Sequence, residues 1–251
     1  MIFHDALPHI PWMDPQLQRL PGIMPLQAGD WLRKDEVYGA QMALRDQLIR
    51  DSLGGVHVVL PQAQDAAREV LEMGLARIGH TGPSATRVDG VQVAIDWDQP
   101  LITLGRLVQE DICILQDDGA QYCLTGAILC FPASWTLAQK IGRPMMAIHT
   151  PVDSYTDEMG ARVHRMFSAL RPDQGLWRMN YMTYGSADLH HPRLENDPRP
   201  PYGERPYLRA ERQCLIRLPR TRAVVFSIHT YLMRIADLDE AARDSLLKLH
   251  P

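Results

Sequence analysis

The chain has 251 residues with a formal net charge of −4, and 45% of its residues are hydrophobic. This composition is typical of a globular protein and excludes a largely disordered chain. The slight excess of acids gives no general attraction to phosphate backbones or anionic lipids, so no nucleic-acid partner is expected. The longest apolar runs are too short to cross a bilayer, so no membrane association is expected either.

The beginning of the chain and its cysteines indicate a compartment. The first residues lack the basic start and the long apolar stretch of a secretory signal. The cysteines form no Cys-x-x-Cys pair, and most lie in apolar, strand-like stretches, which favours buried reduced thiols over disulfides or a zinc site. They are Cys113, Cys123, Cys130 and Cys214. The sequence therefore predicts a cytoplasmic protein.

The first third of the chain predicts an extended segment followed by two helices. Residues 1–30 are rich in proline and in short apolar anchors such as Pro11-Trp12, which predicts a segment that runs over the surface of one domain spanning 1–251. Apolar residues at helical spacing predict helices over 35–50 and 63–78. Gly79 follows the second helix, as a C-terminal cap would.

From residue 90 onward the pattern changes to strands. A helix over 153–170 has apolar residues at steps of three or four, and a short helix is predicted over 239–249. The turn Pro219–Arg222 predicts an antiparallel hairpin. The polar loop 185–206 is long enough to indicate a functional role. Strands are predicted over 91–95, 112–115, 122–131, 144–149, 176–184, 207–218 and 223–232. The sum is an α+β fold with a mainly antiparallel sheet and flanking helices.

The chain lacks the specific motifs of several enzyme classes. There is no Gly-x-Gly-x-x-Gly loop and no phosphate-binding loop, which predicts no nicotinamide or ATP site on this chain. There is no Gly-x-Ser-x-Gly nucleophile turn and no His-Glu-x-x-His zinc helix. The cysteine spacing cannot hold an iron–sulfur cluster.

Two of the ten histidines stand out because each ends or interrupts an apolar run. His149 follows Met145–Ile148, and His229 follows Val224–Ile228. One interpretation is a hydrogen-bonded histidine of the core. The other is an axial haem ligand, because neutral imidazole binds iron well from a rigid mount in an apolar pocket.

Two acids precede the apolar run Ile112–Leu115. Strand alternation places Glu110 and Asp111 on opposite faces, so at most one is expected to point inward. A carboxylate facing a dry pocket could hold a cationic amine. The alternative is a pair of structural acids that bind arginines or cap the strand.

Several cations are candidates for binding the anionic propionates of a haem. The strand 207–218 carries Arg209 and Arg217 on one face and Arg212 on the other. Further cations surround the His149 region: Lys140, Arg143, Arg162, Arg165 and Arg178. Ordinary ion pairing at the surface remains an alternative for each of them.

Several segments, in the same order, resemble the haem-dependent oxidative N-demethylase family. They are Val108–Leu115, Phe131–Trp135, Lys140–Pro144, Ile148–Val152, Trp177–Tyr181, Leu208–Gln213 and Arg217–Thr221. The resemblance covers about residues 25–235. Two positions depart from the family pattern: Tyr181 stands where tryptophan is usual, and His229 stands where arginine is usual. The second departure favours His149 over His229 as the iron ligand.

The resemblance implies a haem b in a PAS-like α+β fold. We assign His149 as the metal ligand and expect Arg178 and Arg212 to bind the cofactor. Glu110 or Asp111 is expected to act as the catalytic acid that contacts the amine.

The implied activity is that of a monooxygenase acting on a small secondary amine such as dimethylamine, with O2 consumed and formaldehyde released. In such a family the electrons come from a separate NADPH-dependent reductase that carries FMN and 2Fe-2S, which agrees with the missing nucleotide motifs. A different interpretation is a haem-binding sensor of PAS-like fold without turnover. A third is an interaction subunit that has lost its haem.

Overall fold

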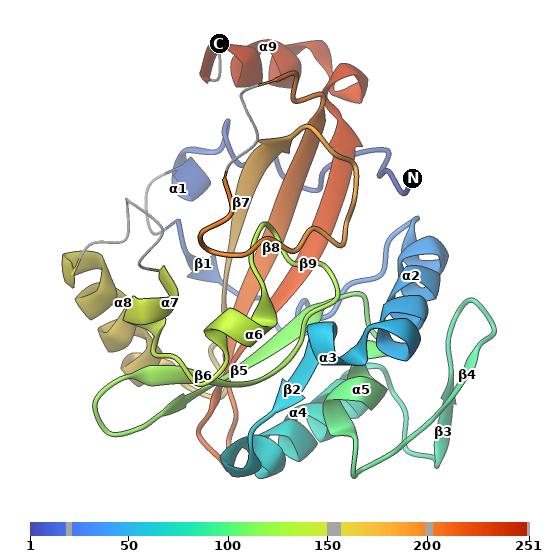
Figure 1. Cartoon of the computed structure of the whole chain (residues 1–251), viewed down its shortest axis with the longest axis vertical. Coiled ribbons are helices and arrows are strands. Elements are labelled where there is room, and N and C mark those ends of the chain that lie inside the picture. The colour runs from blue at the N-terminus through green and yellow to red at the C-terminus, as the bar shows by residue number, and fades with distance from the viewer. Residues whose placement is uncertain (19–21, 150–156, 199–202, 250–251) are drawn as a thin grey trace.

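The computed structural model describes residues 1–18, 22–149, 157–198 and 203–249, and for His149, Asp157 and Met159 it describes the backbone alone. A seven-stranded antiparallel sheet forms the centre, with the order β1-β7-β8-β9-β5-β6-β2 (Figure 1). Its strands are β1 (Met24–Pro25), β2 (His57–Val59), β5 (Asp111–Asp117), β6 (Tyr122–Ile128), β7 (Leu176–Tyr184), β8 (Tyr207–Arg217) and β9 (Val224–Arg234). A separate ribbon pairs β3 (Ser84–Thr86) with β4 (Gln92–Ala94).

Helices cover both faces of this sheet. The longer ones are α2 (Tyr38–Asp51), α4 (Gln64–Arg77), α8 (Asp157–Ala169) and α9 (Glu240–Leu249). The shorter ones are α1 (Pro15–Gln18), α3 (Leu53–Val56), α5 (Pro100–Gly105), α6 (Leu137–Lys140) and α7 (Met145–His149), with 3-10 turns at Pro61–Ala63 and Ile235–Asp237. None of the described helices is long and apolar enough to cross a membrane.

The alternation of side chains along the strands builds two separate cores. On the face that we call the α4 face, strand residues pack against helices α2, α4 and α5. These strand residues include Ile112, Ile114, Ala210, Cys214 and Val225. On the opposite face, the α7 face, strand residues pack against α6, α7 and α8. They include Cys113, Leu115, Leu215, Val224 and Ile228. The two faces therefore offer two chemically distinct environments.

The hairpin of β8 and β9 is fixed at its turn by a buried acid from α4. Glu69 accepts hydrogen bonds from the backbone amides of Arg220 (2.7 Å) and Thr221 (2.8 Å) and from the Thr221 hydroxyl (2.6 Å). Arg222 adopts a left-handed backbone with φ of 62°. Helix α4 thus holds the turn that the sequence predicts at Pro219–Arg222.

Most of the predicted elements are confirmed. The helices predicted over 35–50 and 63–78 are α2 and α4, and Gly79 follows α4 with a φ of 74°. The α+β architecture with a large antiparallel sheet and flanking helices is likewise confirmed. The predicted helix over 153–170 corresponds to α8, although residues 153–156 lie outside the described part of the chain.

The strand predicted over 144–149 is wrong, because this segment forms helix α7. Met145, Met146 and Ala147 are good helix formers, and Ile148 N donates to the Pro144 carbonyl at 2.9 Å. A short apolar run has no periodicity that separates a buried strand from a buried helical turn. The correction matters because His149 is the last residue of α7 rather than the end of a strand.

The N-terminal segment supplies buried side chains at the end of the sheet. Trp12 is 1% exposed, packs in one cluster with Leu208 and Met233, and donates from Nε1 to the Ala242 carbonyl of α9 at 3.1 Å. The His4 amide donates to the Leu232 carbonyl at 2.8 Å.

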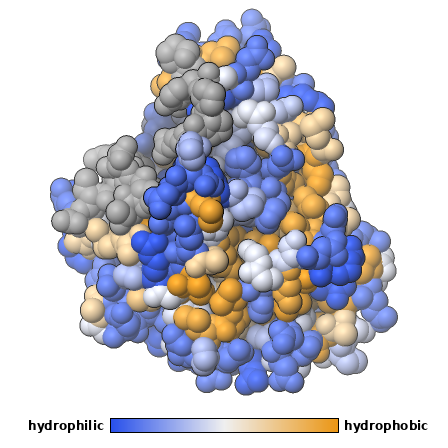
Figure 2. All heavy atoms as spheres, viewed as in Figure 1, coloured by the Kyte–Doolittle hydropathy of each residue, from blue (hydrophilic) through white to orange (hydrophobic). Residues whose placement is uncertain are grey.

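Hydrophilic residues cover much of the side shown in Figure 2, and apolar residues gather in its lower half.

Candidate functional site

Helix α7 is anchored at its C-terminal end by two cations and an acid. Lys140 Nζ donates to the Ile148 carbonyl (2.6 Å) and to Glu195 Oε1 (2.5 Å). Arg143 donates to the Ala147 carbonyl and to Glu195, each at 2.9 Å. Cations are favourable at this end of a helix, where carbonyl groups lack partners. Lys140 and Arg143 therefore fix the backbone beside His149. The side chain of His149 lies outside the described part of the structure.

The anchor of α7 (Lys140, Arg143 and Glu195) also joins α7 to the long loop 185–206. Glu195 belongs to this loop, and its amide donates to Gln139 Oε1 at 3.0 Å. Hydrogen bonds from Lys140 and Arg143 hold the pKa of the Glu195 carboxyl below its ordinary value. The anchor thus ties α6 and α7, which are neighbours in the sequence, to a loop residue more than 50 positions further along the chain.

The α7 face carries a polar area on β7, β8 and β9. The strand register pairs Arg178 with Gln213, Asn180 with Glu211, and Glu211 with Thr230. Glu211 is 8% exposed and accepts hydrogen bonds from Arg209 Nε (3.2 Å) and Gln213 Nε2 (3.1 Å). We call these residues (Arg178, Asn180, Glu211, Gln213 and Thr230) the polar floor of the α7 face.

Two atoms of the polar floor are buried without a hydrogen-bond partner among the described residues. They are Arg178 Nε and Thr230 Oγ1. Burial lowers the pKa of the Arg178 guanidinium, and the charge of Glu211 offsets this only in part. Because an unpaired buried donor costs about 1–3 kcal/mol, such groups mark places where a further group binds.

Loop 185–206 and the segment Phe131–Trp135 lie beside the polar floor, and we call them the rim of loops. Arg209 donates to the Leu189 carbonyl at 2.9 Å and also to the Phe131 carbonyl. The His190 ring lies 2.8 Å from the Cys130 carbonyl, and Ser134 N donates to the His191 carbonyl at 2.9 Å. The predicted functional loop is therefore bound to the segment Phe131–Trp135 across this face.

Arg178 and Arg212 lie on opposite faces of the sheet. Arg212 pairs with Met179 in the register and packs on the α4 face. Its guanidinium donates to both the carbonyl and the carboxylate of Asp30, each at 2.8 Å, and lies over the Trp177 ring. The two arginines thus face different surroundings, and one bound group on one face cannot contact both.

Asp111 is held by three donors. It accepts from Arg45 Nη1 (2.6 Å) and from the backbone amides of Cys130 (2.7 Å) and Phe131 (2.8 Å). Arg45 is fully buried and also donates to the carbonyls of Gly105 and Glu110. Asp111 therefore has the surroundings of a structural acid that fixes the end of β6 to α2.

Glu110 is buried in a second network, on the α4 face. Its Oε1 lies 3.0 Å from His229 Nδ1 and accepts from the Arg33 amide at 2.8 Å. His229 Nε2 lies 2.8 Å from Asp35 Oδ2, which also lies 3.0 Å from His4 Nε2. Glu110 and Asp111 are each 1% exposed, so the expectation that at most one points inward is wrong. Helices cover both faces of the sheet, and both acids are therefore enclosed.

The carboxylates around His229 raise its pKa and contact both of its ring nitrogens. Burial alone would lower the pKa of His229, but hydrogen bonds to Asp35 and Glu110 outweigh it and raise that pKa to about 9. Burial would raise the pKa of Asp35, but His229, His4 and Gln109 hold it well below its ordinary value. Both ring nitrogens of His229 face carboxylates inside the α4 face, away from α7 and the polar floor.

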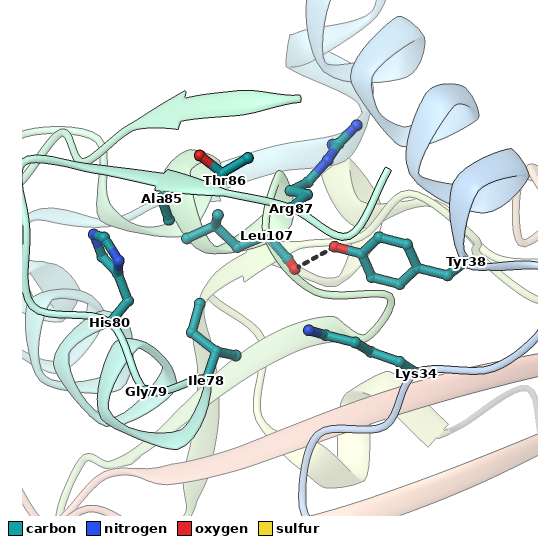
Figure 3. Close-up of a pocket in the computed structure, with 9 residues that line it drawn as sticks. All are labelled: Lys34, Tyr38, Ile78, Gly79, His80, Ala85, Thr86, Arg87 and Leu107. Carbon is teal, nitrogen blue, oxygen red and sulfur yellow. Dashed lines mark hydrogen bonds between the residues drawn. The ribbon is translucent and has the colours of Figure 1, made fainter. Parts of the chain in front are cut away.

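A pocket of about 230 Å³ lies away from these residues, beside the end of α4 (Figure 3). Lys34, Tyr38 and His80 surround it, and the Tyr38 hydroxyl donates to the Leu107 carbonyl at 3.0 Å. None of the five predicted site residues lines this pocket.

Sequence reasoning missed four residues that the structure brings into these networks. Glu195 lies in loop 185–206 and Glu211 lies in the family-like segment Leu208–Gln213, but neither was singled out as a site residue. Asp35 lies 194 residues before His229 and contacts it, and His4 lies 225 residues before His229 and contacts Asp35. Strand alternation could have placed Glu211 on the face opposite to Arg212. Nothing in the local sequence indicates the contact of His4.

Comparison with known families gives one match across nearly the whole chain. The model of a family described as "Haem-dependent oxidative N-demethylase, alpha subunit-like" matches residues 22–249. The match includes the anchor of α7, the polar floor and, apart from His4, the network around Glu110. The chain therefore belongs to the haem-dependent oxidative N-demethylase alpha subunit-like family.

Proposed function

We propose that this protein is the haem-binding monooxygenase subunit of a multicomponent system that removes a methyl group from a small secondary amine such as dimethylamine. The family match over residues 22–249 carries this proposal. The anchored end of α7 and the polar floor support it, because together they provide a rigid mount and unpaired polar groups on one face.

We propose a PAS-like haem-binding core made of β5 to β9. Counted from β5, these strands lie in the order 2-1-5-4-3, and the helices α6, α7 and α8 connect the second strand to the third across one face. In this arrangement α7 and the α7 face would hold the cofactor, and His149 would be the iron ligand.

The residues of the α7 face fit a haem b. Arg178 offers a buried guanidinium with an unpaired Nε, which suits an anionic propionate. Arg212 is already paired with Asp30 on the other face, and it is therefore not part of this assignment. When bound, the haem supplies the binding and reductive activation of O2. The chain holds the cofactor in place, and the rim of loops excludes water from it.

We propose Glu211, rather than Glu110 or Asp111, as the acid that contacts the amine. Glu110 and Asp111 are engaged by His229 and Arg45 away from the polar floor, whereas Glu211, which pairs with Arg209 at 3.2 Å, lies on the α7 face beside the unpaired Thr230 hydroxyl. A carboxylate in such a dry setting binds a cationic amine and orients it. Thr230 can accept a further hydrogen bond from the ammonium group.

The electrons come from a separate NADPH-dependent reductase with FMN and 2Fe-2S. The sequence offers no nucleotide-binding loop or iron–sulfur ligand set on this chain, and the family name denotes a subunit. A haem-binding sensor would share the cofactor-binding residues but would release no formaldehyde.

An absorption spectrum of the haem-supplemented protein tests the cofactor assignment. A Soret band is expected, and His149→Ala should abolish or strongly shift it, whereas His229→Ala should retain it if the variant folds. Lys140→Met should weaken haem retention, because the backbone beside His149 loses its anchor. Arg162→Met is the control, since its partner Glu158 is exposed on the surface of α8.

Formaldehyde release with a suitable reductase, NADPH and dimethylamine separates the enzyme from a sensor. A Soret band without formaldehyde release in all tested amines would favour the sensor. A folded protein that binds no haem would refute both.

A further inference from the structure

A cluster of metal-binding side chains lies on the α4 face, outside the proposed haem site. His4, Asp35 and His229 each offer one ligand atom, and these atoms lie within 4.8 Å of one another. Asp35 Oδ2 lies 3.0 Å from His4 Nε2 and 2.8 Å from His229 Nε2. Three donors from the N-terminal segment, the approach to α2 and strand β9 thus converge on one point.

The second atom of each donor has a partner that orients it. His229 Nδ1 lies 3.0 Å from Glu110 Oε1, and His4 Nδ1 lies 3.1 Å from the Leu232 amide and 3.3 Å from the Leu232 carbonyl. Asp35 Oδ1 accepts a hydrogen bond from Gln109 Nε2 at 2.7 Å. Histidines that bind metals commonly donate their other nitrogen to a carboxylate, as His229 can to Glu110, and such partners strengthen metal binding.

The charges of the cluster are also suited to a cation. Asp35 and Glu110 are two carboxylates in a dry environment, with side chains 12% and 1% exposed. Among the described residues, their ion pairs are formed with His4 and His229 and with no lysine or arginine. Glu110 Oε2 is buried without a hydrogen-bond partner. A divalent ion would neutralise both acids, whereas one protonated imidazole between them neutralises only one.

We propose that His4, Asp35 and His229 bind a zinc-class divalent cation, with Glu110 as the acid that orients His229. Two imidazoles and one carboxylate are a ligand set that suits Zn²⁺, and a water molecule can complete the four positions at the partly open side of Asp35. The ion links residue 4 to β9 and to the start of α2. The site is separate from the proposed haem.

Zinc binding to the tag-free full-length protein tests this proposal. The protein is treated with a chelator and titrated with Zn²⁺ by calorimetry, and one tight site per chain is expected. Asp35→Asn and His4→Gln should each remove that site, and Glu110→Gln should weaken it by roughly 10–100-fold. His57→Ala is the matched control, because His57 is half-buried and Nε2 has no hydrogen-bond partner among the described residues.

Thermal unfolding gives a second measurement on the same samples. Zn²⁺ should raise the Tm of the wild type and of His57→Ala but leave that of His4→Gln unchanged. Equal zinc affinity in the wild type and in folded Asp35→Asn and His4→Gln would overturn the proposal, as would no zinc binding by the wild type. Either result would mean that hydrogen bonds, without a metal ion, join His4, Asp35 and His229. The readout is zinc, so it does not depend on the haem.

Discussion

At the scale of single residues, buried charges account for much of the specificity of this fold. Asp111 contacts Arg45 of α2 and the backbone amides of Cys130 and Phe131, so it joins two segments that are far apart in the sequence. Removing one partner of a buried ion pair leaves the other charge uncompensated, which costs about 3–5 kcal/mol. Asp111 therefore acts on stability rather than on a substrate.

Asp111→Ala should lower the free energy of unfolding by roughly 3–5 kcal/mol in a denaturant titration, because Arg45 would remain buried and unpaired. Asp98→Ala is the control: its side chain is 90% exposed, so a change within about 0.5 kcal/mol is expected. A stable Asp111→Ala variant with weakened amine binding would instead indicate that Asp111 contacts the substrate.

Glu69 makes the free energy of unfolding depend on pH in the acidic range. Burial alone would raise its pKa, but hydrogen bonds from Thr221 and Arg220 outweigh it and hold the pKa below the usual value of 4.5. A carboxyl with a lowered pKa in the folded state stabilises the protein above its usual pKa, and this contribution is lost as the pH falls through the lowered value.

Glu69→Gln should therefore cost roughly 1–3 kcal/mol at neutral pH, since two backbone amides of the hairpin turn lose a charged acceptor. The difference between wild type and variant should shrink as the pH falls through the lowered pKa of Glu69. Unfolding curves across this range measure it. A difference that stays constant with pH would contradict the assignment.

The sequence identified candidate residues, but it did not determine which partner each of them contacts. The sequence singled out Glu110, Asp111, Arg178 and Arg212, and all four are enclosed or partly enclosed in the structure. It could not assign their partners, because Arg45 lies 66 residues before Asp111 and Asp30 lies 182 residues before Arg212. Such contacts depend on the folded topology and leave no local pattern.

At the scale of elements, the contact of α7 with α8 depends on a glycine. A Cβ atom added at Gly160 would collide with Sδ of Met146. Gly160 is buried, and α8 therefore approaches α7 more closely than a larger residue would allow. This approach positions the segment that ends at His149.

Gly160→Ala should destabilise the protein by about 1 kcal/mol and weaken haem retention, because the flexible Met146 side chain must shift from its contact with α8. Gly54→Ala is the matched control in helix α3, since no atom lies within 4 Å of an added Cβ there. Unfolding curves and the height of the Soret band measure the two effects. Equal behaviour of the two variants would show that the packing tolerates a methyl group.

The elements themselves were largely predictable where their periodicity was long. Strands β7, β8 and β9 span nine or eleven residues each, and their apolar and β-branched runs give clear boundaries. Helix α7 has five residues and was expected as a strand, because so short an apolar run fits either structure. The element that carries the proposed iron ligand is thus the one whose type the sequence could not determine.

At the scale of the whole molecule, the N-terminal segment closes one end of the sheet. Trp12 packs beside residues of β8, β9 and α9, and its Nε1 binds Ala242. The segment was expected to run over the surface, yet its aromatic anchor is almost fully buried. Proline content predicts an extended backbone but does not predict what its apolar side chains will contact.

Trp12→Ala should cost about 3–5 kcal/mol and should loosen α9 together with the N-terminal segment, because both lose a shared aromatic contact. Hydrogen exchange of the α9 amides and denaturant unfolding measure this. Trp97→Ala is the control, since Trp97 is 46% exposed and a much smaller loss is expected. Unchanged exchange in α9 would mean that the helix docks without Trp12.

The contacts of His4 with Leu232 and of Trp12 with Ala242 join residues 228 and 230 positions apart. During translation, residues 4 and 12 must therefore wait until β9 and α9 have been synthesised before their docking surface exists. Trp12 lacks this surface through that interval, and we expect it to be accessible to chaperones. Docking of the N-terminal segment consequently follows the synthesis of α9, and nascent chains halted before β9 should be captured with that segment still accessible to protease.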